Sequence, residues 1–327
     1  MIAARHIIAL LKSHIAGDDQ QFLSVAMQVA AHEARQGHGK LAQEMRDLID
    51  AAKARPSAVE RRPGGPVPLV QPKGELANLL SVRYSDVRLG SMVLTDGLEQ
   101  RLRRTLLEQT QQERLRAHGL VPRRKLLLVG PPGAGKTMTA AALAGELRLP
   151  LFTVVLDGLI SKFMGDTAGK LRLVFEAMAA TRGVYFFDEF DALGARRTAE
   201  NDVGEIRRVL NSFLQFLEQD DSQSLIVAAT NHADLLDRAL FRRFDDVLEY
   251  ALPDAALIER LLKARLAAFT ADRIDWNAVA EAAVGLSHAE STRAADEAAK
   301  AAVLDGGTTI TTQALLAAIA ERRAATE

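Results

Sequence analysis

The chain has 327 residues, 48% of them hydrophobic, with a formal net charge of −1 at pH 7 and a pI near 6.7. This length and composition predict more than one domain with ample apolar material for a core, and the near-neutral charge excludes a global basic field of the kind that binds nucleic acid. The absence of cysteine excludes a disulfide framework and thiolate metal sites.

The beginning of the chain resembles a signal peptide only superficially. Residues 1–11 are mostly apolar, but Arg5 and His6 interrupt them, and no small-residue cleavage pattern follows. We therefore expect a helix here. No apolar run approaches the ~20 residues of a membrane-spanning helix, so we expect a cytoplasmic protein.

Composition divides the whole chain into four regions. Residues 1–55 are expected to form an N-terminal helical bundle, because apolar residues recur there at helical spacing. Residues 56–80 are expected to be a linker, because proline and glycine are dense between Pro56 and Pro72. An α/β subdomain is predicted over 81–252, and an all-helical subdomain over 253–327.

Short apolar runs alternate with helical stretches through the α/β region, which predicts a parallel five-stranded sheet covered by helices. The predicted strands are 125–129, 151–156, 184–187, 225–229 and 247–250. The Ala-rich tail predicts helices over 255–269, 276–283, 287–304 and 312–323.

Residues 130–137 read Gly-Pro-Pro-Gly-Ala-Gly-Lys-Thr and fit the phosphate-binding pattern G-x-x-x-x-G-K-[ST]. The segment lies between an apolar strand and an Ala/Leu-rich helix, the context in which backbone N–H groups and a helix N-terminus surround a triphosphate. Lys136 is placed to reach the β- and γ-phosphates, and Thr137 to ligate Mg²⁺. We expect nucleotide contacts from Pro132, Gly133, Ala134, Gly135, Lys136, Thr137 and Met138.

A second acidic motif follows the predicted strand 184–187, which ends in Asp188 and Glu189. A buried parallel strand delivers such carboxylates to the sheet edge beside the phosphate loop. Asp188 is expected to hold Mg²⁺ through water, and Glu189 to polarise the attacking water as a general base. The sequence therefore predicts hydrolysis of the nucleotide.

Together these motifs resemble the classical AAA group of AAA+ ATPases, which includes katanin, spastin and the ATP-dependent membrane proteases. The resemblance covers residues 84–305 and implies ATP and Mg²⁺ as cofactors and a helical lid at 253–327. Tyr84-Ser85-Asp86-Val87 is similar to the segment ahead of the family's first helix, near which the adenine pocket forms. Ala228-Ala229-Thr230-Asn231 resembles the first sensor, in which Asn231 would hold the water or the γ-phosphate.

Residues 236–245 resemble the arginine-finger segment of the same family. Arg242 and Arg243 are adjacent here, whereas the common pattern separates its two arginines by Pro-Gly, so the choice between them stays open. A guanidinium supplied by a neighbouring subunit is worth ~10³-fold or more in rate. The resemblance thus implies a homo-hexameric ring.

Two further segments resemble functional parts of the family. Lys162, Phe163 and Met164 are similar to the central-pore loop, in which an exposed aromatic grips an extended peptide, with Met164 as an adaptable contact. Residues 285–290 resemble the lid turn that usually reads Ser-Gly-Ala-Asp. His288 replaces its Gly, and we expect His288 and Ala289 to lie beside the nucleotide.

The preferred interpretation is a ring ATPase that remodels or unfolds a protein client, recruited by the N-terminal bundle. One alternative is an ATP-dependent regulator that switches a partner protein without threading it. A nucleic-acid-directed ATPase is the other, kept open by two basic clusters, although the near-neutral charge argues against nucleic acid. The clusters are Arg101, Arg103 and Arg104, and Arg123, Arg124 and Lys125.

Overall fold

The computed structural model describes residues 71–159, 164–190, 202–235, 238–271 and 273–326, together with residues 26, 27, 29, 30 and 43. The chain divides into two compact units, Met1–Pro68 and Leu69–Glu327. Most of the N-terminal region expected to be a bundle, and the linker as far as residue 70, lie outside the described residues.

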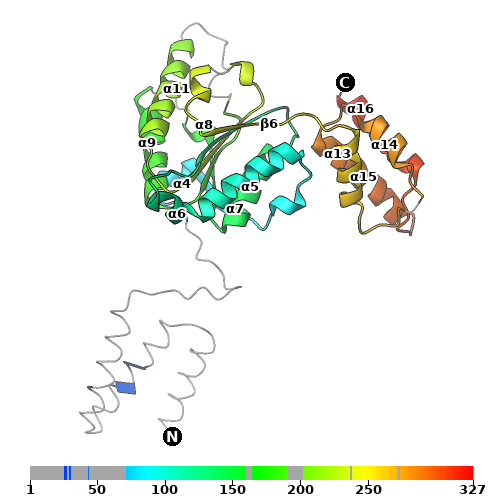
Figure 1. Ribbon diagram of the computed structural model, residues 1–327, viewed down its shortest axis with the longest axis horizontal. Helices are drawn as coiled ribbons and strands as arrows, with labels where there is room; N and C mark the ends of the chain where they lie inside the picture. Colours follow the sequence, from blue (N-terminus) through cyan, green and yellow to red (C-terminus); the bar gives the residue numbers. More distant parts are fainter. Residues whose placement is uncertain are drawn as a thin grey trace. The chain divides into compact units, whose positions relative to one another are not determined.

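A six-stranded sheet with the order β1-β3-β4-β5-β2-β6 forms the centre of this unit (Figure 1). All neighbouring strands pair in parallel except β1 and β3, which are antiparallel. The strands are β1 (Leu80–Arg83), β2 (Lys125–Val129), β3 (Leu151–Val154), β4 (Val184–Phe187), β5 (Leu225–Thr230) and β6 (Asp246–Glu249).

The predicted α/β fold and its five parallel strands are confirmed, but the expected count of strands was one too low. The additional strand, β1, has only four residues, and its burial alternates because it lies at the edge of the sheet. Such a short, half-buried strand gives little periodic signal. The helical turn α4 (Leu76–Leu79) precedes it, so regular structure begins inside the interval 56–80 that was expected to be linker.

Two layers of helices cover the sheet, because alternate residues of each strand face opposite sides. On one face, α5 (Asp96–Thr110) and α7 (Lys136–Leu147) pack over Leu126, Leu128 and Phe186. On the other face, α9 (Met164–Ala180) and α11 (Asp202–Gln219) pack over strand residues that include Phe187 and Ile226. The central strands β4 and β5 are buried along their whole length, as expected for parallel strands covered on both faces.

Short elements connect these layers. They are the 3₁₀ turns η1 (Leu89–Ser91) and η2 (Ala233–Leu235), and the helices α6 (Gln112–Ala117), α8 (Leu156–Leu159) and α12 (Arg238–Phe241). The helix α9 begins at Met164.

Four helices form the C-terminal subdomain around a separate apolar core, as the sequence predicted. Aspartate or serine side chains cap three of the helices by accepting a backbone N–H in the first turn, which explains why their starts were readable. The helices are α13 (Ala255–Arg265), α14 (Trp276–Ala283), α15 (His288–Leu304) and α16 (Thr312–Thr326). Among the described helices, none is long and apolar enough to cross a membrane.

The segment ahead of α5 is fixed directly to α7, through one backbone carbonyl and one side chain of that helix. The Arg88 guanidinium donates to the Gly145 carbonyl, and the Leu89 N–H donates to Glu146 Oε1 at 2.9 Å. A Cβ on Gly145 would overlap the carbonyl oxygen of Val87. Glycine at this helix position therefore permits the close approach that places the following residues, 91–94, beside the phosphate loop.

We predict that Gly145→Ala destabilises the unit by roughly 1–3 kcal/mol, since overpacking forces the backbone apart. The matched control is Gly97→Ala in α5, where an added Cβ meets nothing within 4 Å. That substitution should be neutral or stabilising by up to about 1 kcal/mol. Thermal unfolding of both variants checks this, and equal midpoints would contradict the close-packing argument.

Candidate functional site

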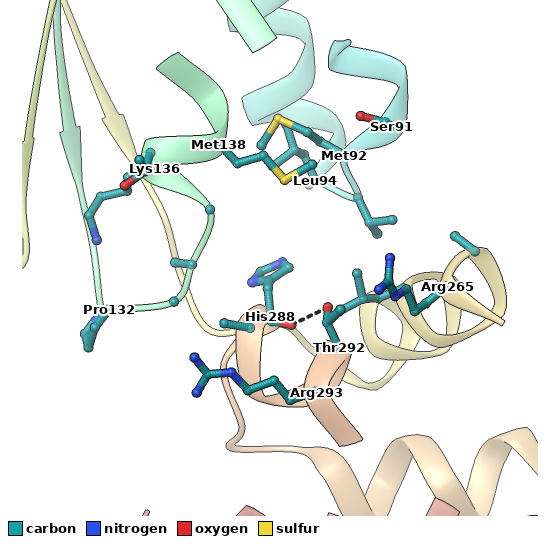
Figure 2. A pocket seen from close by; sticks show the side chains of 18 of the residues that line it. Ser91, Met92, Leu94, Pro132, Lys136, Met138, Arg265, His288, Thr292 and Arg293 are labelled. Carbon is teal, nitrogen blue, oxygen red and sulfur yellow. Dashed lines mark hydrogen bonds between the residues drawn. The ribbon is translucent and has the colours of Figure 1, made fainter. Parts of the chain in front are cut away.

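A cavity of about 750 Å³ opens where the phosphate loop, the carboxyl ends of β4 and β5, and the C-terminal helices meet (Figure 2). Twelve of the residues predicted from sequence line it, and they come from four separate parts of the chain. They are Pro132, Gly133, Ala134, Gly135, Lys136, Thr137, Met138, Asp188, Glu189, Asn231, His288 and Ala289. Parallel topology explains why the phosphate loop, the acidic pair and Asn231 converge, because the carboxyl ends of neighbouring strands share one edge.

The Lys136 ammonium is the centre of the phosphate-loop geometry. Its Nζ donates to the carbonyl oxygens of Gly130 at 2.6 Å and Pro131 at 2.8 Å, and to Asn231 Oδ1 at 2.8 Å. The side chain thus joins the beginning of the loop to the residue that follows β5. Gly133 and Gly135 adopt φ values of +73° and +100°, which turn the loop around this cation.

The acidic motif lies directly across from the loop. Thr137 Oγ1 donates to Asp188 Oδ2 at 2.8 Å, so the hydroxyl and the carboxylate lie side by side. These two oxygen groups match the preference of Mg²⁺ for hard oxygen ligands. Glu189 is exposed and has a φ of +49°, a left-handed conformation that costs a non-glycine residue roughly 1–2 kcal/mol. Such strain commonly accompanies a functional role.

The backbone on either side holds Glu189 in this conformation. Its N–H donates to Asp188 Oδ1 at 3.0 Å, and the N–H of Phe190 donates to the Ala229 carbonyl at 2.8 Å. Phe190 is fully buried in the core. The core therefore anchors the residue after Glu189, while the Glu189 carboxylate stays at the cavity.

The C-terminal helices contact the phosphate loop directly. The Ala289 N–H donates to the Gly133 carbonyl at 3.0 Å, and a Cβ on Gly133 would lie 2.6 Å from Ser287 Oγ. The start of α15 is thus packed against the tip of the loop, and the α13 residues Leu261 and Ala264 complete an apolar wall. This wall has the character of a pocket for a flat nucleobase.

His288 is the first residue of α15, and its ring extends from the helix toward the cavity (Figure 2). Neither ring nitrogen has a hydrogen-bond partner in the part of the chain that the structure describes, and both are shielded from solvent. Burial lowers the pKa of His288, which favours the neutral imidazole. A rotation of this ring toward a ligand would break no hydrogen bond.

The two arginines of the finger segment lie apart from the residues that line the cavity. Both are exposed. The Arg243 Nε is 2.7 Å from Glu218 Oε1, whereas Arg242 has no ion-pair partner among the described residues. The predicted pore-loop residues Lys162 and Phe163 lie outside the described residues, and of Met164 the structure gives the backbone, at the start of α9.

Sequence reasoning missed several residues of the cavity wall. They come from residues 91–94 and from the sides of α13 and α15 that line the cavity. The amphipathic pattern predicted these helices, but it could not tell which exposed positions face a cavity. The missed residues are Ser91, Met92, Val93, Leu94, Leu261, Ala264, Arg265, Thr292 and Arg293.

The site matches a known family. Residues 126–252 match the family described as "ATPase family associated with various cellular activities (AAA)". A protein of Sinorhizobium fredii, described as the uncharacterized AAA family ATPase y4kL, is 35% identical over 291 residues, which is 88% of this chain and 86% of that protein. The chain belongs to the AAA family of ATPases. It therefore hydrolyses ATP, and the resemblance to the classical AAA group is confirmed.

Other relatives match a smaller share of the chain. The proteasome-activating nucleotidase of Pyrococcus horikoshii is 36% identical over 209 residues, which is 62% of this AAA chain and 52% of that protein. The ATP-dependent zinc metalloprotease FtsH 3 of Sphaerobacter thermophilus is 38% identical over 207 residues, which is 61% of this AAA chain and 42% of that protein. The AAA chain thus spans about half of the length of these two relatives.

A solved structure supports the fold. The crystal structure of the FIGL-1 AAA domain superposes with a TM-score of 0.60 at 23% identity, covering 76% of this AAA chain and 89% of that domain.

Proposed function

We propose that this AAA ATPase is an Mg²⁺-dependent homo-hexameric ring that uses ATP hydrolysis to remodel or unfold a protein client. The observation that carries the proposal is one continuous set of contacts. Lys136 joins the phosphate loop to Asn231, and the same loop contacts the C-terminal lid through Gly133 and Ala289. A change at the phosphates would therefore reach both the sensor and the lid.

The residues divide the chemistry among them. Lys136 binds the β- and γ-phosphates by exchanging its carbonyl partners for phosphate oxygens, and the inward-facing amides of the loop add further donors. Thr137 and Asp188 would hold Mg²⁺, which neutralises charge on the phosphates when it is bound. Glu189 accepts a proton from the attacking water, and Asn231 orients that water or the γ-phosphate. His288 and Ala289 contact the nucleoside side.

We predict that two substitutions separate binding from hydrolysis. Lys136→Ala should weaken ATP binding more than about 100-fold, since charge-assisted hydrogen bonds worth ~1.5–3 kcal/mol each are lost. Glu189→Gln should keep ATP affinity but slow turnover by about 10²–10⁴-fold, the usual contribution of a general base. Calorimetric titration and phosphate release measure the two quantities.

Either result can fail independently. An unchanged dissociation constant in Lys136→Ala would contradict the role of the phosphate loop, and unimpaired turnover in Glu189→Gln would place the catalytic base elsewhere. Removal of Mg²⁺ by a chelator should stop hydrolysis in the wild type. Hydrolysis that persists would contradict the metal role of Thr137 and Asp188.

We infer that Arg242 is the arginine finger. Arg243 is engaged by Glu218 on its own chain. Arg242 is exposed next to it and has no ion-pair partner among the residues that the structure describes. Because neither arginine lines the cavity of its own chain, the guanidinium would act on the nucleotide of a neighbouring subunit.

We predict that Arg242→Ala slows hydrolysis by about 10³-fold or more while ATP affinity is retained, and that the matched variant Arg243→Ala has a smaller effect. Mixing Arg242→Ala subunits with Glu189→Gln subunits should restore part of the activity, because some junctions then combine an intact Glu189 with an intact Arg242. A mixture that stays inactive, or a larger loss in Arg243→Ala, would contradict this assignment.

The structure weakens the case for a nucleic-acid-directed ATPase. All five arginines of the two basic clusters have acidic partners: Arg103 pairs with Glu99 at 2.7 Å, Arg104 with Glu108 at 3.1 Å, and the remaining three pair with Asp246 or Asp220. The ammonium of Lys125 donates to the Leu217 carbonyl, and burial lowers the pKa of Lys125. These cations serve the fold, which leaves fewer free charges for phosphate backbones.

Substitutions in the proposed pore loop, residues 162–164, can distinguish an ATPase that threads its client from one that only switches a partner. The proteasome-activating nucleotidases and FtsH proteases among the relatives favour a protein client. We propose that residues 81–252 are the ATPase core, that 253–327 are its lid, and that 1–55 recruit the client.

We predict that Phe163→Ala abolishes processing of a client recovered with the Glu189→Gln variant, while basal ATPase activity stays within about twofold of the wild type. In the proposed pore role an aromatic side chain grips a passing chain, and this role is separate from the chemistry proposed for the ATP site. Unchanged processing in Phe163→Ala would favour the switch over threading. A parallel loss of ATPase activity would instead place Phe163 in the core.

A further inference from the structure

Tyr250 is a buried tyrosine that neither the sequence motifs nor the cavity wall include. It follows β6 directly and is 5% exposed within the apolar cluster that also holds α7. Its hydroxyl lies 2.6 Å from Thr139 Oγ1, and Thr139 is completely buried. Burial raises the pKa of Tyr250, so the phenol stays protonated.

The direction of this hydrogen bond follows from a second contact. Thr139 Oγ1 donates to the Gly135 carbonyl at 3.1 Å, so its single proton is used there. The Tyr250 hydroxyl must then be the donor to Thr139. The result is a buried chain from the phenol through the threonine hydroxyl to the carbonyl of the last glycine of the phosphate loop.

The backbone of Tyr250 also contacts the opposite end of the loop. Its N–H donates to the Val129 carbonyl at 2.7 Å, immediately before the loop begins. A Cβ on Gly130, whose φ is +153°, would overlap the Tyr250 carbonyl oxygen. One residue thus touches both the first glycine of the loop, by its backbone, and the last, through Thr139.

Tyr250 also begins the connection to the lid. Residues 251–254 lead from it to Ala255, the first residue of α13, and Asp254 caps that helix by accepting the Leu257 N–H at 2.8 Å. A hydrogen-bonded polar chain inside an apolar cluster is favourable only when every group is satisfied, so it specifies one geometry.

We propose that Tyr250 is a positioning residue, which holds the phosphate loop in its nucleotide-binding shape from both ends by means of Thr139. The proposal rests on the ATP-binding role of the loop given above. A loop that is already ordered loses less entropy when the phosphates bind. Removal of the phenol hydroxyl should therefore weaken the binding of the triphosphate.

Calorimetric titration of the full chain with a non-hydrolysable ATP analogue and with AMP tests this proposal. We predict that Tyr250→Phe and Thr139→Val each weaken binding of the analogue by about 3- to 10-fold, the range for one buried hydrogen bond. Binding of AMP, which lacks the β- and γ-phosphates, should change less than twofold. Thr139→Ser keeps a hydroxyl and should bind like the wild type.

Tyr185→Phe is the matched control. Tyr185 is fully buried, and its hydroxyl donates to the carbonyls of Ala177 and Thr181 at 3.0 Å on the other face of the sheet. Its loss should lower the unfolding temperature as much as Tyr250→Phe does, without changing affinity for the analogue. The double variant Tyr250→Phe/Thr139→Val should bind the analogue no more weakly than the single variant with the lower affinity, because both substitutions break the same hydrogen-bonded chain.

The outcomes are distinct. If Tyr250→Phe and Tyr185→Phe lower the unfolding temperature alike and neither changes affinity for the analogue, Tyr250 is merely a core residue and the proposal is wrong. Should Tyr250→Phe fail to fold, the difference between Thr139→Val and Thr139→Ser decides, and equal affinities would overturn the proposal. A wild type that does not bind the analogue at all would instead contradict the proposed function.

Discussion

The arrangement of the site depends on the hydrogen bonds of the Lys136 ammonium. The residue is only 7% exposed, and a buried cation is costly unless several oxygens surround it. Its oxygen partners come from the beginning of the loop and from Asn231, after β5. The hydrogen bonds that surround this charge therefore close the loop and connect the end of β2 with the end of β5. Thr137, the next residue, is brought to Asp188 by the same closure.

The features predicted from sequence are those that local chemistry determines. The phosphate loop, the acidic pair after β4 and Asn231 each follow an apolar strand, so parallel topology alone brings them to one edge. The C-terminal helices were equally readable, because Asp254, Asp275 and Ser287 cap the first turns of three of them. The family resemblance added the meaning of these residues, which spacing could not supply.

What the sequence did not show depends on contacts between distant segments. Arg101 pairs with Asp246 across 145 positions, so this member of a basic cluster that suggested nucleic acid is engaged within the fold. The apolar wall near Leu261 depends on which face α13 turns toward the loop. Tyr250 carries no motif at all, and its importance follows from the two ends of the loop that it touches.

The placement of β1 has a consequence for self-association through the sheet. An exposed strand edge offers unpaired N–H and C=O groups to any other chain. Here β1 is itself an edge strand and has only four residues, so it offers few pairing groups; the opposite edge strand, β6, also has four residues and begins with Asp246, held by two arginines. Charged side chains on an edge oppose strand addition. Copies of this ATPase can therefore crowd together without their sheets joining into a continuous β-structure.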